Sequence, residues 1–202
     1  MTISTKETIL QVASQLFADS GYDNTSVRDI AKGADVNISA INYHFKSKVG
    51  LFAEVLNHNI ETLRSQFTEL YSVATSTEDC AVRIYSHFEK ESNTFYNSMK
   101  MFLVNNLPLE EDIIPKSCSG EQKGPPGTEI LMEMIRKEID FKGEETLLLW
   151  AARNIMHNII IISLVSQSSF VKMMNKEVAH FSEEEKIESI RRNVRSTLNF
   201  IR

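Results

Sequence analysis

Apolar side chains recur along this 202-residue chain at the three- and four-residue spacing of helices. The pattern predicts helices over about residues 4–20, 26–34, 38–45, 47–73, 78–96, 98–106, 128–142, 144–167 and 182–201. No stretch of the sequence alternates apolar and polar residues as a half-buried strand would, and there is no internal repeat. The sequence therefore predicts an all-α protein.

Capping residues define where the first and last helices begin. Ser4 with Glu7 has the spacing of a capping box, in which a hydroxyl and a carboxylate satisfy free backbone N–H groups of the first turn. Ser182 with Glu185 has the same spacing. Gly21 suits the end of the first helix, because glycine reaches the left-handed conformation without steric cost.

Two short helices with a tight turn between them are predicted within residues 25–46. Thr25 and Ser26 carry hydroxyls that can cap the first of these helices. Asp35 follows that helix, and Asp tolerates the left-handed conformation of a sharp turn. Asn37 can then cap the second helix. This is the helix-turn-helix pattern, whose second helix lies in the major groove of DNA.

This stretch resembles the TetR family of bacterial transcriptional regulators over about the first 56 residues. The resemblance is carried by Gly21-Tyr22, Thr25-Ser26-Val27-Arg28-Asp29-Ile30-Ala31, Val36-Asn37 and Ile41-Asn42-Tyr43-His44-Phe45-Lys46-Ser47-Lys48. The chain departs from the family at Asp35, where glycine is usual, and at Ile38, where a polar residue is common. The resemblance implies a three-helix DNA-binding domain over residues 1–46 and a helical effector-binding and dimerisation domain over residues 47–202.

Nine residues are candidates for DNA contacts. Thr25, Ser26, Tyr43 and Lys48 are predicted to contact phosphates, and Arg28, Asn37, Ser39 and Asn42 are predicted to contact base edges, since Arg prefers guanine and Asn prefers adenine. The family resemblance implies that Tyr43, His44 and Lys48 bind the DNA backbone. Asn37 and Ser39 have an alternative role as capping or solvated residues, and His44 as a packed histidine.

The helix predicted over residues 144–167 is apolar around much of its circumference, which is typical of a helix buried on most sides. Burial against a second copy would satisfy it, and the family uses its last two helices for dimerisation. A dimer would also place two recognition helices one DNA turn apart. The predicted dimer residues are Leu147, Ile155, Ile159, Ile162, Ile190, Val194 and Leu198.

The middle helices correspond to the effector-binding region of the family in position only. Large apolar and polar side chains there could line a pocket, with ordinary core packing as the alternative for each. The predicted pocket residues are Phe67, Tyr71, Phe88, Tyr96, Phe102, Met134, Trp150 and His157. Residues 107–127 hold all four prolines and are predicted to form a long loop, after which Thr128 caps a helix.

Charge and cysteine content narrow the class of protein further. The net charge of −5 does not suggest a DNA-binding protein, so the prediction depends on where the basic residues gather. Cys80 and Cys118 do not form a disulfide framework and are expected to be free thiols, with a redox switch as the alternative. No signal peptide is recognised and the apolar runs, such as residues 159–162, are far too short to span a bilayer, which predicts a cytoplasmic protein with no membrane association.

The sequence contains no phosphate-binding glycine loop, serine elbow or metal-binding motif, so no enzymatic activity, metal or cofactor is expected. The predicted function is that of a ligand-responsive transcriptional regulator, a repressor in most members of this family. It would bind a palindromic operator in double-stranded DNA as a homodimer and be released by a small-molecule effector. Two alternatives remain: a regulator that responds to a protein partner or a redox signal, and an all-helical interaction protein that does not bind DNA.

Overall fold

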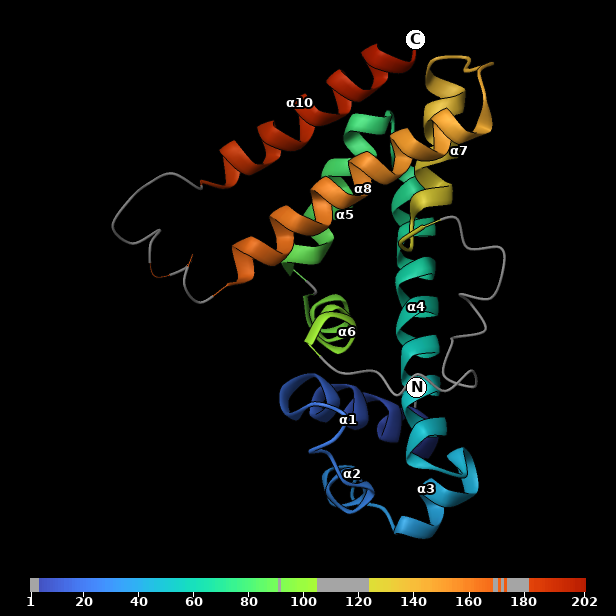
Figure 1. Cartoon of the computed structure of the whole chain (residues 1–202), viewed down its shortest axis with the longest axis vertical. Helices are drawn as coiled ribbons and strands as arrows, with labels where there is room; N and C mark the ends of the chain where they lie inside the picture. The colour runs from blue at the N-terminus through green and yellow to red at the C-terminus, as the bar shows by residue number, and fades with distance from the viewer. Residues whose placement is uncertain (1–3, 91, 105–123, 169–170, 172, 174–181) are drawn as a thin grey trace. The chain divides into compact units, whose positions relative to one another are not determined.

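The computed structural model describes residues 4–90, 92–104, 124–168, 171, 173 and 182–202, without the side chains of residues 92–93 and 102–104. Helices account for the regular structure of these residues, and they include no strand (Figure 1). The helices are α1 (Thr5–Ser20), α2 (Val27–Gly33), α3 (Ile38–Phe45), α4 (Lys48–Val73), α5 (Thr77–Lys90), α6 (Ser92–Val104), α7 (Thr128–Glu138), α8 (Glu145–Gln167) and α10 (Glu183–Ile201). The predicted all-α class is confirmed.

Two helix boundaries differ from the predicted ones. The apolar pattern predicted a break near residue 97, but α5 ends at Lys90 and α6 begins at Ser92. α7 ends at Glu138, before the predicted residue 142, because Asp140 is left-handed (φ 48°) and a helix does not continue through that conformation.

The helices form two compact units. Unit 1 contains Met1–Leu63 and Asn93–Gln122, and unit 2 contains Arg64–Ser92 and Lys123–Arg202. α4 is one unbroken helix, so its first part belongs to unit 1 and its last part to unit 2. The sequence analysis placed a domain boundary between residues 46 and 47, according to which residues were expected to bind DNA. A division into compact units does not test that boundary, so the boundary stays a prediction.

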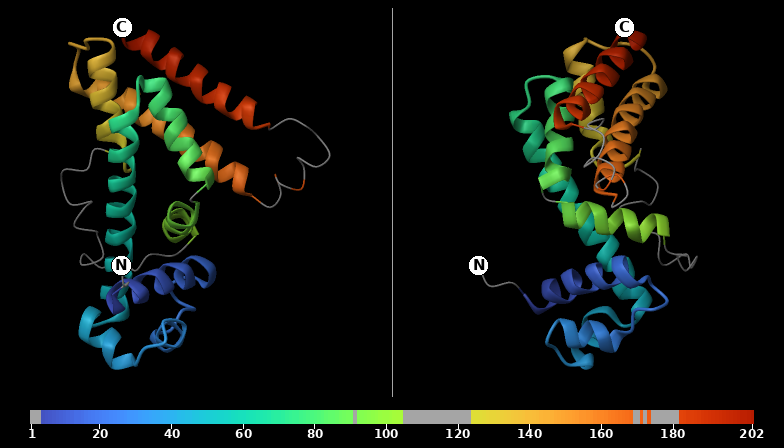
Figure 2. Two further views of the ribbon diagram at one scale, coloured as in Figure 1. Left: turned by 180° about the vertical axis from the view of Figure 1, so that it is seen from behind. Right: turned by 90° about the vertical axis from the view of Figure 1, so that its left-hand side faces the viewer.

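An apolar core joins α1, α2, α3, the first part of α4 and α6 in unit 1 (Figures 1 and 2). Ile9, Phe17, Ile30 and Phe52 are fully buried in it, and the ring of Phe17 meets that of Phe52 edge-on with 5.0 Å between centroids. Met101 of α6 is also fully buried in this core. A segment far along the chain therefore completes the unit that carries the helix-turn-helix.

Hydrogen bonds add to this core at the junction of α1 with α4 and α6. The Asn59 side-chain amide of α4 donates to the Ser14 hydroxyl of α1 over 3.1 Å, in a buried position. The Asn97 amide of α6 donates to the Gln15 amide oxygen of α1 over 3.0 Å. Because buried polar groups need partners, these pairs fix how α4 and α6 lie against α1.

α8 packs against α5, α7 and α10 in unit 2 (Figure 2). Its side chains Leu148, Ala151, Ile155 and Ile159 are fully buried. By length and apolar composition α8 could cross a membrane, but the core helix of a globular domain meets the same test. Packing of the three other helices buries 39% of the apolar window of α8, so part of its apolar surface stays exposed within a single chain.

Gly127 begins α7 and lies close to the core of unit 2. It takes the N-cap position that was predicted for Thr128, and it is left-handed with φ 94°. Thr128 is instead the first helical residue, and its hydroxyl donates to the Pro125 carbonyl over 2.7 Å. A β-carbon at Gly127 would lie 2.7 Å from Met156 Cε and 2.8 Å from Phe67 Cδ2, which leaves no room for a side chain.

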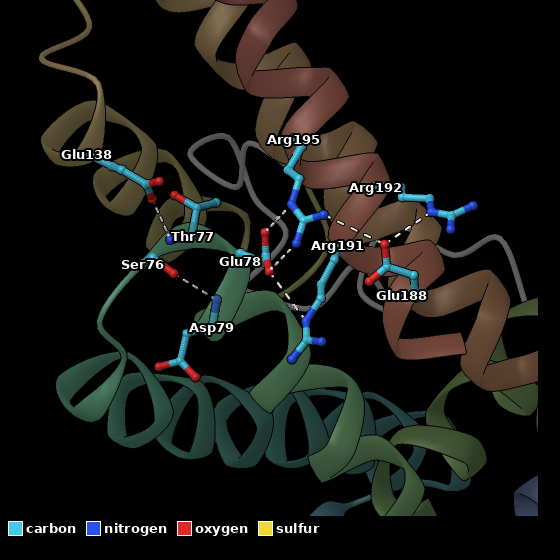
Figure 3. A network of polar contacts seen from close by, with 9 residues as sticks. All are labelled: Ser76, Thr77, Glu78, Asp79, Glu138, Glu188, Arg191, Arg192 and Arg195. Atoms are coloured by element: carbon cyan, nitrogen blue, oxygen red, sulfur yellow. Dashed lines mark hydrogen bonds and ion pairs between the residues drawn. The ribbon is translucent and has the colours of Figure 1, made fainter. Parts of the chain in front are cut away.

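Polar contacts tie the N-terminus of α5 to α7 and α10 (Figure 3). The Glu78 carboxylate accepts two hydrogen bonds from the Arg195 guanidinium, over 2.8 and 3.0 Å, and lies 3.3 Å from Arg191 Nε. The backbone N–H of Thr77 donates to the Glu138 carboxylate over 2.6 Å. Such paired guanidinium contacts have a defined geometry, so they set the orientation of α10 on α5.

Candidate nucleic-acid interface

Hydrogen-bonded caps begin both α2 and α3, and a left-handed residue lies in the turn between the two helices. The Ser26 hydroxyl accepts from the Asp29 backbone N–H, and the Asp29 carboxylate accepts from the Ser26 backbone N–H, each over 3.1 Å. Hydrogen bonds from the Ser26 hydroxyl and backbone lower the pKa of Asp29 below its usual range. Asp35 has φ 53° in the turn, and Asn37 Oδ1 accepts from the Ser39 N–H over 3.0 Å. The predicted turn and the caps by Ser26 and Asn37 are confirmed, whereas Thr25 does not cap α2.

α3 has one buried face and one exposed face. Ile41 and Phe45 anchor it in the core of unit 1 at 1% and 4% exposure. The opposite face presents Ser39, Asn42, Tyr43 and His44 to solvent. Tyr43 is 83% exposed, which is unusual for an aromatic ring and leaves it available to a partner. His44 is exposed as well, so the structure does not support its alternative role as a packed histidine.

Lys48 is held at the N-terminus of α4 by an aromatic residue. Its ammonium lies 4.2 Å from the centroid of the Tyr22 ring and 3.5 Å from the Asp23 carbonyl oxygen. Tyr22 packs in turn on Phe17 and Phe52, with 5.8 and 5.2 Å between ring centroids. The free N–H groups and dipole of a helix N-terminus attract anions, so the ammonium adds to a site suited to phosphate. The contact of Tyr22 with Lys48 was not predicted from the sequence.

Other basic and acidic side chains of unit 1 lie around this surface. Arg28, Lys32 and Lys46 are exposed on α2 and at the end of α3. Two acidic residues of unit 1 lie in ion pairs: Asp19 with Lys100 over 3.1 Å and Glu54 with Lys6 over 3.0 Å. These pairs offset two acidic charges, whereas Asp23, Asp29 and Asp35 stay exposed in the same unit.

The structure corrects the assignment of Thr25. This side chain is 3% exposed, and its hydroxyl donates to the Leu16 and Gly21 carbonyls over 3.1 and 2.8 Å. It therefore fixes the chain at the end of α1 instead of reaching a phosphate. The sequence could not distinguish these roles, because both use a threonine hydroxyl. Ser26 is exposed, but its hydroxyl is engaged in the capping box with Asp29.

Comparison with known proteins assigns this unit to a family. Residues 9–55 match the model of the bacterial regulatory proteins of the tetR family. Over these residues the chain is a TetR-family protein. The matched residues run from α1 into α4 and so include α2, the turn and α3. The regulators of this family are not enzymes, in agreement with the prediction.

Individual regulators match a part of the chain. The probable HTH-type transcriptional regulator YttP of Bacillus subtilis (strain 168) is 46% identical over 77 residues, which are 38% of this chain and 33% of YttP. The HTH-type transcriptional repressor KstR2 of Mycolicibacterium smegmatis is 37% identical over 73 residues, 36% of each chain. The matches thus span about a third of these relatives.

The fold of the whole chain is shared more widely. A TetR transcriptional regulator structure from Legionella pneumophila aligns with a TM-score of 0.63 at 21% identity, covering 98% of this chain and 99% of that one. This similarity establishes the TetR-family fold for the regions outside residues 9–55.

Among the described residues, those predicted to line an effector pocket lie at different places in the fold. Phe67, Phe88 and Met134 are buried core residues, and the rings of Phe67 and Phe88 lie 5.4 Å apart. Trp150 and His157 lie on the exposed side of α8, around a depression of about 380 Å³. Tyr71 is half-buried and its hydroxyl contacts the Lys137 ammonium. Tyr96 belongs to unit 1, and the Phe102 side chain lies outside the described residues.

The predicted dimer residues also need correction. Ile155, Ile159, Ile190, Val194 and Leu198 are at most 5% exposed within a single chain, so they hold α8 and α10 in the core of unit 2. Leu147 and Ile162 are half-buried.

A second apolar set remains at the surface of the same two helices. These residues are Trp150 (45% exposed), Ile161 (58%), Val165 (38%) and Phe200 (71%). The rings of Trp150 and Phe200 lie 5.2 Å apart. We call these four residues the α8–α10 apolar face. None of these four residues is among the predicted dimer residues.

Cys80 is a free thiol, buried in α5 of this TetR-family chain. Burial, with a smaller contribution from the Asp79 carboxylate, raises its pKa to about 11. The thiolate is the reactive form, so at neutral pH the folded protein holds Cys80 as an unreactive thiol. In a Cys118→Ser variant, we expect Cys80 to react with a disulfide reagent at pH 7.5 roughly 100-fold more slowly than in denaturant. Stopped-flow absorbance measures both rates, and equal rates would contradict this placement of Cys80.

Proposed function

We propose that this TetR-family chain is a transcriptional repressor that binds operator DNA as a homodimer and releases it when a small molecule binds. The observation that carries DNA binding is the surface of α3. Its inner residues are locked in the core, its N-terminus is capped by Asn37, and its polar residues, including Asn42 and Tyr43, face solvent. A rigid helix with exposed amide, hydroxyl and aromatic groups meets the needs of major-groove recognition.

The proposed contacts fall into two classes. Tyr43, His44 and Lys48 contact phosphates, where the N-terminus of α4 already attracts an anion. Arg28, Ser39 and Asn42 face base edges. Asn37 uses its side-chain oxygen as a cap, so we assign it a supporting role in presenting α3.

We assign dimerisation to the α8–α10 apolar face. An apolar patch of this kind at the surface of a regulator is typical of an interaction site. A two-fold dimer buries the same patch from both copies, and it supplies the two recognition helices that a palindromic operator requires. KstR2 is named a repressor, which supports repression as the output.

Effector release follows from the continuity of α4 in this proposal. Lys48 at the start of α4 faces the DNA backbone, and the helix continues unbroken to Val73 in unit 2. A small molecule bound in unit 2 would shift α4 and change the spacing of the two recognition helices. Coupling between two binding sites is reciprocal, so operator DNA would weaken effector binding by the same factor. The proposed location is the cytoplasm.

Salt-dependent DNA binding tests this function. We expect Lys48→Ala to weaken binding to all duplexes and to reduce the slope of log affinity against log salt by about 2, one phosphate contact per protomer. We expect Asn42→Ala to leave the slope unchanged and to relax specificity at one base pair per half-site, at about 1–3 kcal/mol each. Fluorescence anisotropy on duplexes selected from a random pool measures both effects.

Lys90→Ala provides a matched control, because Lys90 is an exposed lysine on α5 in unit 2. The Lys90→Ala variant should keep the wild-type slope. If the wild-type protein selects no duplex, DNA binding is wrong and the alternative of an interaction protein is favoured. If it selects a duplex and no small molecule weakens binding, a protein or redox signal becomes the favoured input.

A further inference from the structure

Ile38 is a large apolar side chain that the fold buries only in part. It is the first residue of α3 and is 38% exposed, whereas Ile41 one turn later is 1% exposed. The core cluster of unit 1 takes in Val36 as a partly buried member, and among the described residues packed on that cluster Ile38 does not occur. Exposed surface of this kind on a helix that carries polar recognition groups requires a separate explanation.

Local helix chemistry does not explain Ile38 either. Asn37 supplies the cap through its side-chain oxygen, so the start of α3 does not depend on the next residue. A β-branched side chain loses rotamer freedom in a helix and is a weaker helix former than alanine. Val36 and Ile41 occupy the two positions around the cap where an apolar pair closes a helix start. Ile38 therefore contributes little to capping or to the core.

The surroundings of Ile38 indicate what could cover it. Residues at the N-terminus of a recognition helix meet base edges. Ile38 precedes Asn42 by one helical turn, so the two side chains are neighbours on one face, about 5–6 Å apart at Cβ. The major groove is otherwise lined by hydrogen-bond donors and acceptors, and the apolar group that it offers to a side chain is the 5-methyl of thymine.

The geometry points to Ile38 as a specificity-determining residue that reads the 5-methyl group of a thymine in each operator half-site. This inference rests on the proposed DNA-binding function. Four residues of helix rise about 6 Å, and successive base pairs are about 3.4 Å apart. The thymine therefore lies within about two base pairs of the base that Asn42 contacts. A polar residue is common in the family at this position, so Ile38 gives this chain an apolar side chain for base recognition.

Removing single methyl groups from the DNA tests the inference. The probe is a duplex selected by the wild-type dimer, with each half-site thymine replaced in turn by deoxyuridine, which pairs identically but lacks the methyl. At one thymine per half-site we expect wild-type affinity to fall about fourfold, or about 15-fold when both half-sites are changed. Ile38→Ala should bind the thymine and deoxyuridine duplexes equally, and Ile38→Val should retain part of the difference.

Controls separate this inference from the proposed function. Lys90→Ala changes an exposed residue of unit 2, outside the proposed interface, and should keep the full deoxyuridine effect. The melting temperature of Ile38→Ala should stay within about 3 °C of wild type, since the side chain is not part of the core. If a duplex is selected but no thymine responds, or if Ile38→Ala responds as wild type does, the inference is overturned while DNA binding stands. If no duplex is selected, both fail.

Discussion

Gly127→Ala is expected to destabilise the protein by roughly 3 kcal/mol and to lower its melting temperature by about 10 °C. Two effects add. A left-handed backbone costs a residue with a β-carbon about 1–2 kcal/mol, and Gly127 has φ 94°. The new methyl would also lie 2.7 Å from Met156 and 2.8 Å from Phe67, in a buried position. Overpacking of this kind costs about 1–3 kcal/mol.

Gly33→Ala is the matched control for this prediction. Gly33 ends α2 without a left-handed backbone, and an added β-carbon would meet the half-buried Val12 side chain at 2.8 Å. The gain in helix propensity, about 1 kcal/mol, offsets that contact, so the net change should be below about 1 kcal/mol. Differential scanning calorimetry compares the variants. A Gly127→Ala protein that melts like Gly33→Ala would show that neither strain nor crowding acts at Gly127.

Phe200→Glu is expected to convert the proposed dimer to monomers and to weaken operator binding about 100-fold. The two-fold axis introduces the change twice, and each copy would bury a charge where an aromatic ring had packed. The contact of Phe200 with Trp150 would be lost as well. Because Phe200 is 71% exposed in one chain, the monomer itself should remain folded. Sedimentation equilibrium measures the assembly, and circular dichroism checks the fold.

Asn199→Glu places the same charge one residue away, on another side of α10, and should leave the dimer intact. Phe200→Leu should weaken it only slightly, because an apolar group is kept. Dimers that persist in Phe200→Glu would move the interface away from the α8–α10 apolar face. Monomers in Phe200→Glu that bind the operator at full strength would instead show that one helix-turn-helix is sufficient.

Local features of this fold could be predicted from the sequence because they depend on residues within one helical turn. The capping boxes of Ser4 with Glu7 and Ser182 with Glu185 form as predicted. The left-handed turn at Asp35 is also observed. The uninterrupted apolar pattern of α4 predicted its length correctly. These features need no knowledge of the rest of the chain.

Features that depend on distant partners could not be predicted in the same way. Ile159 and Ile161 lie in one apolar run, yet the first is fully buried and the second is 58% exposed. The pattern of α8 is apolar on most sides, so it does not indicate which side meets α5, α7 and α10. Thr25 shows the same limit, because its hydroxyl is engaged by carbonyls at the end of α1.

Met101 has a consequence for constructing chimeric regulators. A DNA-reading module transplanted from this chain as residues 1–63 would leave the core without a side chain that is fully buried there. It would also lose the Asn97 amide that pairs with Gln15. A working transplant must therefore carry α6 or provide a helix with equivalent residues from the recipient. Exchange of modules between family members is thus constrained by a helix that follows the reading motif by almost fifty residues.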